Sequence, residues 1–356
     1  MTSLQSPKTL ASLVARARAK GPVRVAVADA AQEVVLVTMR RAMEEGLAEP
    51  HLVGPRAEIE PLAAAIGFKL DETCLHDSGG DVDAARLAVG LVRDGKADVV
   101  MKGNLHTDIF MRALLDKTLG LRLPGRRVSH VFVVALPSHD RLLGITDAAI
   151  NIAPELTAKA QICQNAVDLF RMLGVVRPKV AVLSAVETGT VDIASTLDAA
   201  SLILMSRRGQ ITGAEMDGPL ALDNAISART ATEKGVLSDV AGSADILLVP
   251  DLVSGNILAK TLEYFAGGVA AGIAIGLAAP VVLTSRADPA PARLAALAIA
   301  ALMYHSRPQV EPRPGPAESS IATAPQLEDA CCPLPVVLNL QPVSVGTQPQ
   351  FEVAAQ

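Results

Sequence analysis

Residues 97–107 read ADVVMKGNLHT, a short apolar run followed by a polar loop and the start of a helix. The apolar run is 99–101, and residues 106–107 open the helix. An amphipathic stretch at 81–94 comes before this segment, and the same alternation of strand and helix begins at 23–28. The pattern predicts an α/β fold with a mainly parallel sheet that is covered by helices on both faces.

The rest of the chain continues this alternation. Further strands are predicted at 51–53, 128–135, 142–145, 180–184, 210–214, 246–249 and 281–284, and helices at 32–45, 59–66, 154–173, 191–205, 220–229 and 291–304. The length of 356 residues corresponds to roughly two domains of ordinary size.

One long uncharged stretch, residues 265–285, resembles a membrane helix in its length and in the four-residue spacing of Gly268, Gly272 and Gly276. Pro280 interrupts the stretch, and residues 281–284 are typical of a strand. We therefore expect a buried helix of small residues that leads into a buried strand, and no membrane partner.

Composition excludes several classes of function. Aromatic residues make up only 2% of the chain and the net charge is −5, which argue against base stacking and against binding of a nucleic-acid backbone. The four cysteines form neither a disulfide framework nor a metal-binding spacing, and residues 1–20 lack the apolar core of a signal peptide. We expect a cytoplasmic protein without a nucleic-acid partner. Residues 307–356 contain nine of the 23 prolines and predict a disordered tail.

Small polar and charged side chains follow five predicted strands at their carboxyl ends. These segments are 102–107, 146–151, 184–189, 250–256 and 284–288. Ligands bind outside the carboxyl ends of strands in open α/β sheets, so the five segments predict one site. A metal role stays open for Asp147, Asp217, Asp251 and Asp288, although we expect each to cap a helix or form an ion pair. The sequence contains neither G-x-x-x-x-G-K-[ST] nor a G-x-G-x-x-G after a strand, so a nucleotide-phosphate loop is not indicated.

These segments also reveal a family. From about residue 23 to residue 305 the chain resembles the phosphate acetyltransferase/phosphate butyryltransferase family. The matching motifs are 101–103 with 106–107, 146–151, 182–184, 216–219, 238–242 with 244–245, 250–252 with 255–256 and 260, and 284–286. Two of them, MKG and TSRAD, are more similar to the butyryl branch than to the acetyl branch.

The resemblance implies reversible transfer of a short acyl group between coenzyme A and inorganic phosphate in a ternary complex, with no tightly bound cofactor and no metal. It also implies two α/β domains with a cleft between them, similar to isocitrate and isopropylmalate dehydrogenases. Residues 1–147 with 281–306 would form the first domain and 148–280 the second, and the strand at 281 would return beside residues 102–107. A homodimer is expected, whereas the acyl-chain preference and the physiological direction stay open.

The resemblance assigns catalysis to Ser285, Arg286 and Asp288. Arg286 would bind the phosphoryl group, because a guanidinium binds phosphate in a bidentate way. Ser285 would donate a hydrogen bond near the thiol or the tetrahedral centre. Asp288 is the nearest carboxylate, although acetyl-type members place theirs several residues further along. The predicted substrate-binding residues are Lys102, Gly103, His106, Thr107, Arg112, Ser184, Asp251 and Asn256.

Three of the weaker assignments have simpler explanations. Arg112 is either a second cation of the site or an exposed charge on a helix, and Ser184 either binds substrate or caps the next turn. Lys260 is expected to be a surface lysine of a helix.

Two other functions stay open. An NAD-dependent decarboxylating dehydrogenase of the same fold would need a metal site from Asp217, Asp223 and Asp251, but the cluster of arginines that such enzymes use is missing. A non-catalytic protein that binds coenzyme A, with a tail that recruits a partner, is the second alternative.

Overall fold

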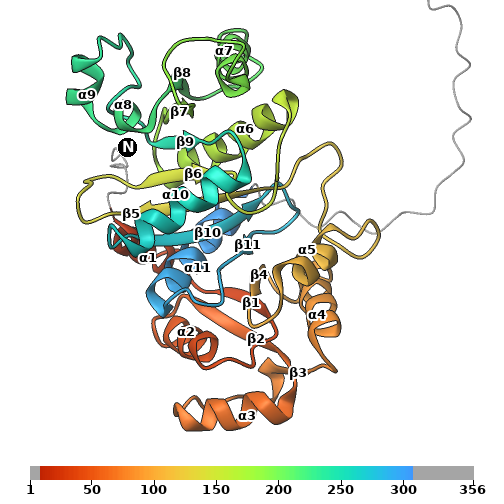
Figure 1. Cartoon of the computed structure of the whole chain (residues 1–356). Helices are drawn as coiled ribbons and strands as arrows, with labels where there is room; N and C mark the ends of the chain where they lie inside the picture. The colour runs from red at the N-terminus through yellow and green to blue at the C-terminus, as the bar shows by residue number, and fades with distance from the viewer. Residues whose placement is uncertain (1–8, 308–356) are drawn as a thin grey trace, which may run out of the picture. The chain divides into compact units, whose positions relative to one another are not determined.

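One mixed sheet of eleven strands runs through residues 9–307, the part of the chain that the computed structural model describes (Figure 1). The strands are β1 Val23–Ala28, β2 Ala48–Gly54, β3 Leu75–Asp77, β4 Val99–Lys102, β5 Ser129–Ala135, β6 Leu143–Thr146, β7 Lys179–Leu183, β8 Glu215–Leu220, β9 Ile246–Leu248, β10 Val269–Ile275 and β11 Val281–Val282. Their order across the sheet is β3-β2-β1-β4-β11-β10-β5-β6-β9-β7-β8. The predicted α/β class is confirmed. The predicted tail at 307–356 lies outside the described residues except for Arg307.

Helices cover both faces of this sheet, as the alternation predicted. They are α1 Leu10–Arg18, α2 Glu33–Glu44, α3 Arg56–Ala65, α4 Asp81–Arg93, α5 Thr107–Leu115, α6 Leu156–Leu173, α7 Ala194–Arg207, α8 Leu222–Ile226, α9 Ala228–Glu233, α10 Leu252–Tyr264 and α11 Ala290–His305, with a 3-10 turn at Glu72–Cys74. No helix among residues 9–307 has the length and apolar character needed to cross a membrane.

The two flanks of the sheet run in opposite directions. Every neighbouring pair from β3 to β11 and from β6 to β8 is parallel, but the pairs β11–β10, β10–β5 and β5–β6 are antiparallel. The prediction of a mainly parallel sheet therefore holds on each flank and is wrong at the centre. As a consequence, β4 and β11 point towards β6 and β9, and the carboxyl ends of the two sets of strands face each other across the central β10–β5 pair.

Register places these carboxyl ends at the middle of the long β10–β5 pair. Met101 pairs with Val282, Val282 with Ile273, and Ile273 with Val131. One residue further along β5, Phe132 pairs with Ile145 of β6. The pairing of β11 with β4 confirms the predicted return of the chain beside residues 102–107.

The region that was expected to be a helix of small residues is strand β10. The spacing of its glycines reflects three separate close approaches and not a helix face. A Cβ on Gly272 would overlap the carbonyl oxygen of Leu283, and one on Gly268 would lie 2.8 Å from that of Leu262. Gly276 has a φ of +90°, and a Cβ there would overlap the carbonyl oxygen of Arg127. Such approaches depend on which strand lies alongside, and the sequence does not reveal that.

A second error concerns residues 210–229. The strand predicted at 210–214 lies instead at Glu215–Leu220, because Gly209 and Gly213 adopt positive φ values and shape a loop before it. The helix predicted at 220–229 is two short helices, which meet at Ser227, and the Ser227 side chain accepts a hydrogen bond from the Thr230 amide.

Apolar packing differs between the two faces of the sheet. On one face a single core joins α1, α2, α6, α7 and α11. On the other face there are two cores: α4 and α5 pack on the β1–β4 flank, and residues of α8 and α10 pack on the β6–β9 flank. The sheet itself is continuous, and the division into domains 1–147 with 281–306 and 148–280 stays a prediction.

Candidate active site

A cavity of about 440 Å³ lies between the two cores of this second face. Leu105 and Leu283 belong to one core, Phe132 and Ala148 belong to the other, and all four line the cavity. Its volume is in the range of small-molecule sites.

Six of the predicted site residues line this cavity. They are Lys102, His106, Thr107, Asn256, Ser285 and Arg286. They come from the ends of β4 and β11 and from α10, so four of the five predicted segments converge, counting Ala148 and Ala149 from 146–151. The segment 184–189 does not line it, and Gly103, Arg112, Asp251 and Asp288 do not line it either.

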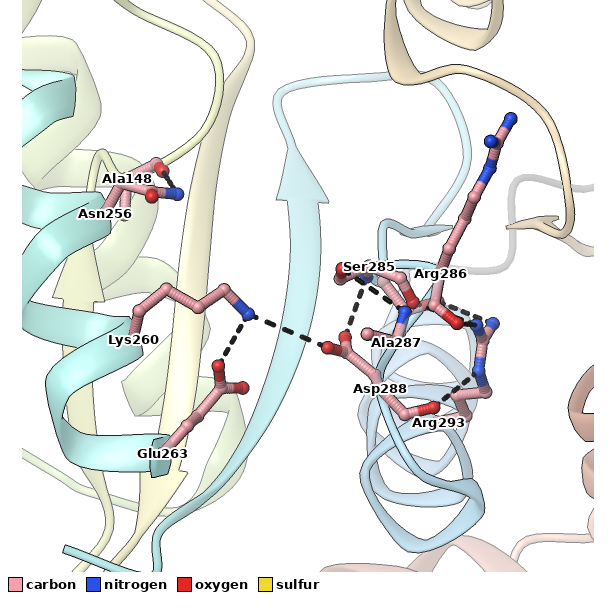
Figure 2. Close-up of polar contacts among 10 residues, drawn as sticks. Ala148, Asn256, Lys260, Glu263, Ser285, Arg286, Ala287, Asp288 and Arg293 are labelled. Atoms are coloured by element: carbon pink, nitrogen blue, oxygen red, sulfur yellow. Dashed lines mark hydrogen bonds and ion pairs between the residues drawn. The ribbon is translucent and has the colours of Figure 1, made fainter. Parts of the chain in front are cut away.

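The loop after β11 presents Ser285 and Arg286 to the cavity. Asp288 is 4% exposed, and its carboxylate accepts a hydrogen bond from the Ser285 amide at 2.7 Å (Figure 2). The Arg286 side chain is exposed and points away from Asp288. Asp288 therefore closes the turn that carries the two other predicted catalytic residues.

Arg293 holds the loop after β11 in place through hydrogen bonds to its backbone. It is fully buried on α11, and its guanidinium donates to the carbonyl oxygens of Asp288 at 3.0 Å, Ser285 at 2.8 Å and Arg286 at 3.2 Å. It also donates to the Thr284 hydroxyl at 3.1 Å. Burial lowers the pKa of Arg293, but it is a guanidinium and stays charged. The predictions missed Arg293, although a single arginine within the apolar run at 292–302 was a signal.

Lys102 is a buried cation at the end of β4, 2% exposed. Among the described residues its ammonium has one hydrogen-bond acceptor, the carbonyl oxygen of Gly103 at 3.5 Å. Burial lowers the pKa of Lys102 to about 8, and the positive charges of Arg286 and Arg293 act in the same direction. Asp288 and another buried carboxylate offset this only in part.

Lys260 was expected to be a surface lysine, and that prediction is wrong. Its ammonium lies 2.6 Å from the Glu263 carboxylate and 3.8 Å from that of Asp288, and it is 5.9 Å from the centre of the Phe132 ring. Figure 2 shows the side chain reaching from α10 towards the loop after β11. Burial lowers the pKa of Lys260, but the two carboxylates outweigh burial and raise it overall.

Asn256 and Asp251 position α10. The Asn256 amide donates to the carbonyl oxygen of Ala148 at 3.3 Å. The Asp251 carboxylate caps the helix by accepting from the Ser254 amide at 2.8 Å. Asp147 accepts from the amides of Ala149 and Ile150, each at 3.0 Å, and so fixes the segment opposite α10.

Gly103 approaches another part of the backbone. A Cβ at this position would overlap the carbonyl oxygen of Asp29 and lie 2.7 Å from that of Ala28. Its amide donates to the Ala28 carbonyl at 2.9 Å. The glycine therefore locks the loop after β4 onto the end of β1.

Arg112 and Ser184 lie away from the cavity. Arg112 is 82% exposed on α5 and lies 3.5 Å from Asp108 one turn earlier, which favours the exposed helix charge over the second cation. The Ser184 hydroxyl is 2.9 Å from that of Ser195 at the start of α7. Their predicted roles in substrate binding have no support from this geometry.

Comparison with known proteins gives this arrangement a context. Residues 78–301 match the family model described as "Phosphate acetyl/butaryl transferase". The chain belongs to the phosphate acetyl/butyryl transferase family. It is 48% identical to a phosphate acetyltransferase of Rhizobium meliloti, over 83% of this chain and 93% of that protein. It is 44% identical to a phosphate butyryltransferase of Clostridium acetobutylicum, over 83% of this chain and 98% of that protein.

Solved structures show the same family fold. A branched-chain phosphotransacylase from Enterococcus faecalis V583 is 29% identical and superposes with a TM-score of 0.69, over 80% of this chain and 99% of that one. A phosphotransacetylase from Streptococcus pyogenes is 25% identical with a TM-score of 0.70, over 83% and 99%. The resemblance recognised from the sequence motifs is confirmed.

One further residue lines the cavity and was missed by the predictions. His130 lies on β5, is fully buried, and has no hydrogen-bond partner for either ring nitrogen among residues 9–307. Its only signal in the sequence is a histidine within an apolar strand, and such residues often lie in a core.

Proposed function

We propose that this protein transfers a short acyl group, acetyl or butyryl, between coenzyme A and inorganic phosphate in a ternary complex, without a tightly bound cofactor. The observation that carries this proposal is the composition of the cavity wall. Three cationic side chains, Lys102, Lys260 and Arg286, line the same cavity as the apolar side chains of Phe132 and Leu283. The cations suit a phosphoryl group, and the apolar wall suits a short acyl chain.

The reaction needs no other reactant. The thiol sulfur of coenzyme A attacks the carbonyl carbon of the acyl phosphate, and the carbonyl electron pair moves onto oxygen. The pair returns as the bond from carbon to the phosphate oxygen breaks, which leaves a thioester. Phosphate departs with that bonding pair, and the proton lost by the thiol makes it hydrogen phosphate.

Each group has a role within this scheme. Arg286 binds the phosphoryl oxygens as a bidentate donor, and Lys102, mostly protonated at pH 7, adds positive charge. The Ser285 hydroxyl donates near the tetrahedral centre. Asp288 holds the Ser285 amide at 2.7 Å, so we assign it to positioning this turn. His106 and Thr107, at the start of α5, contact the exposed part of the substrates.

The test is release of free thiol from acetyl-, propionyl- and butyryl-coenzyme A with and without inorganic phosphate. We expect phosphate-dependent release from at least one of them. Arg286→Ala should lower kcat/KM at least 100-fold, because it removes the donor that binds the phosphoryl group. The melting temperature should not change, because the Arg286 side chain is exposed and its loss removes no core contact. Arg229→Ala is the matched control, since Arg229 is an exposed arginine of α9 outside the cavity. Full activity of Arg286→Ala would contradict the assignment.

The two alternatives predict different outcomes. A protein that only binds coenzyme A would be stabilised by it in a thermal melt but would release no thiol. A dehydrogenase would need its aspartates together, yet Asp223 pairs with Lys234 at 2.9 Å and Asp251 caps α10. Among residues 9–307 no three His, Cys, Asp or Glu side chains are grouped so that they could hold a metal ion.

We also propose the organisation that the family resemblance implies: two α/β domains like those of isocitrate dehydrogenase, a homodimer, and a cytoplasmic location. Support for a dimer comes from exposed apolar side chains on α10, where Val253, Ile257 and Tyr264 are each at least 60% exposed. Sedimentation of the intact protein should give twice the mass of the chain, and a monomer would contradict this part.

A further inference from the structure

The imidazole of His130 is unlike the other polar groups of the cavity, because it is fully buried and unpaired. Neither Nδ1 nor Nε2 has a hydrogen-bond partner among the described residues, yet the ring lines the cavity. An unpaired buried polar group destabilises a protein, so a position of this kind calls for an explanation.

The surroundings fix the position of the ring, and the Leu283 carbonyl is near enough to influence its pKa without the geometry of a hydrogen bond. The His130 amide donates to the Asp147 carboxylate at 3.2 Å, and its carbonyl accepts from the Thr146 hydroxyl at 2.8 Å. The ring meets Phe132 edge to face, with the ring centres 4.4 Å apart. Gly272 of β10 leaves room for it, since a Cβ there would lie 3.0 Å from Nε2.

Charge also limits what His130 can bind. Burial lowers its pKa to about 4, although the Asp147 carboxylate and the Leu283 carbonyl act against this. The ring is therefore neutral near pH 7, with one nitrogen that donates and one that accepts. A neutral donor is not suited to hold a phosphoryl dianion, for which Lys102, Lys260 and Arg286 are available.

The walls around the ring favour one part of the substrate. Phe132, Leu283 and Ala148 are buried and apolar, whereas Arg286, His106 and Thr107 are exposed. We expect the acyl chain against the buried apolar wall and the phosphoryl group and coenzyme A towards the exposed side. The acyl carbonyl, which joins them, is then the polar atom nearest to His130.

We propose that His130 donates a hydrogen bond to the carbonyl oxygen of the acyl group and stabilises the negative charge that forms there in the transition state. This inference rests on the proposed acyl transfer. The carbonyl oxygen gains negative charge when sulfur attacks and loses it when the bond to phosphate breaks. A fixed neutral donor stabilises this charge without changing its own protonation state.

Two variants separate hydrogen bonding from shape. His130→Phe keeps a planar ring but cannot donate, whereas His130→Gln keeps a donor. His130→Phe should lose about 100- to 1,000-fold in kcat, the usual effect of removing one such donor, with KM for butyryl-coenzyme A and phosphate within threefold of the wild type. His130→Gln should stay within about tenfold of the wild type. His130→Phe should also melt at or above the wild-type temperature, because it removes two unpaired buried polar atoms.

A spectroscopic measurement tests the contact directly. Infrared difference spectra of the bound ¹³C-carbonyl butyryl-coenzyme A, without phosphate, should show a lowered carbonyl stretching frequency in the wild type and not in His130→Phe. His130→Leu, which also lacks a donor, provides the same comparison if the Phe variant does not fold, and His130→Gln should keep the lowered frequency.

The outcomes distinguish the inference from the function on which it rests. An active wild type with a folded His130→Phe variant within threefold of its kcat would overturn the inference alone. A Gln variant as inactive as the Phe variant would also count against it, because shape would then matter and the hydrogen bond would not. A wild type without phosphate-dependent thiol release would overturn the proposed function, and this inference with it.

Discussion

Replacing Lys102 by Met removes a buried ammonium and leaves an apolar side chain of similar length at the end of β4. In the folded protein the pKa of Lys102 falls from its ordinary 10.5 to about 8, first through burial and then through the charges of Arg286 and Arg293. At 1.36 kcal/mol for each pKa unit, this lowering corresponds to about 3 kcal/mol. That free energy is the penalty for keeping this ammonium charged inside the fold.

The sign of the pH dependence follows from the direction of the shift. Between about pH 8 and pH 10.5 the unfolded chain keeps a proton on Lys102 that the folded protein has released. Stability of the wild type therefore rises with pH in this window because of Lys102, and the penalty is fully present below about pH 8. Lys102→Met lacks this contribution. Its advantage in unfolding free energy over the wild type should shrink by about 3 kcal/mol from pH 7.5 to pH 10.5.

Urea denaturation of both proteins at several pH values in phosphate-free buffer measures this difference, and other titrating groups cancel between them. Lys260→Met is the matched control, because ion pairs raise the pKa of Lys260 and so its replacement should show no such gain at pH 7.5. Parallel stability curves for the wild type and Lys102→Met would refute the reasoning. The substituted protein should at the same time lose activity, since the site would have one cation fewer.

Two more substitutions test how the site is held. Arg293→Met leaves three loop carbonyls and the Thr284 hydroxyl without their donor. We expect the unfolding free energy from urea denaturation to fall by on the order of 3 kcal/mol and kcat to fall as well. Wild-type values for both would contradict this role. Gly103→Ala forces a Cβ against the backbone of Asp29 and Ala28, which should lower the unfolding free energy by about 3 kcal/mol. Gly189→Ala is the control and should be close to neutral, because the space around Gly189 is open. Equal effects of the two substitutions would be evidence against the close approach.

Local sequence patterns were sufficient for most elements of the fold. The strand at Val23–Ala28 and the helix that ends before Gly174 were predicted from an apolar run and from a glycine after a periodic stretch. The motifs at 102–107 and 284–286 were sufficient to predict that β4 and β11 lie together. These signals are local, since each depends on neighbours within a few residues or on a motif that belongs to one family.

The same local sequence pattern can also be compatible with two different secondary structures. The glycines at 268, 272 and 276 fit a helix as well as a strand, and the pairing of β10 with β5 and β11 selected the strand. The reversal of direction at β10 and β5, which brings two sets of carboxyl ends to one cavity, depends on the order of strands across the sheet. No short segment carries that order.

The sequence by itself determined the α/β class, the family, and the cavity position of Lys102, Ser285 and Arg286. Only the tertiary structure showed that Arg293 supports the loop after β11, that Lys260 reaches towards Asp288, and that His130 is buried without a hydrogen-bond partner among the described residues. The physical reason is that the partners, the burial and the pKa of a side chain depend on segments far away in the chain. For His130 these are the strands on either side of it and the turn after β6, and they meet only when the sheet has formed.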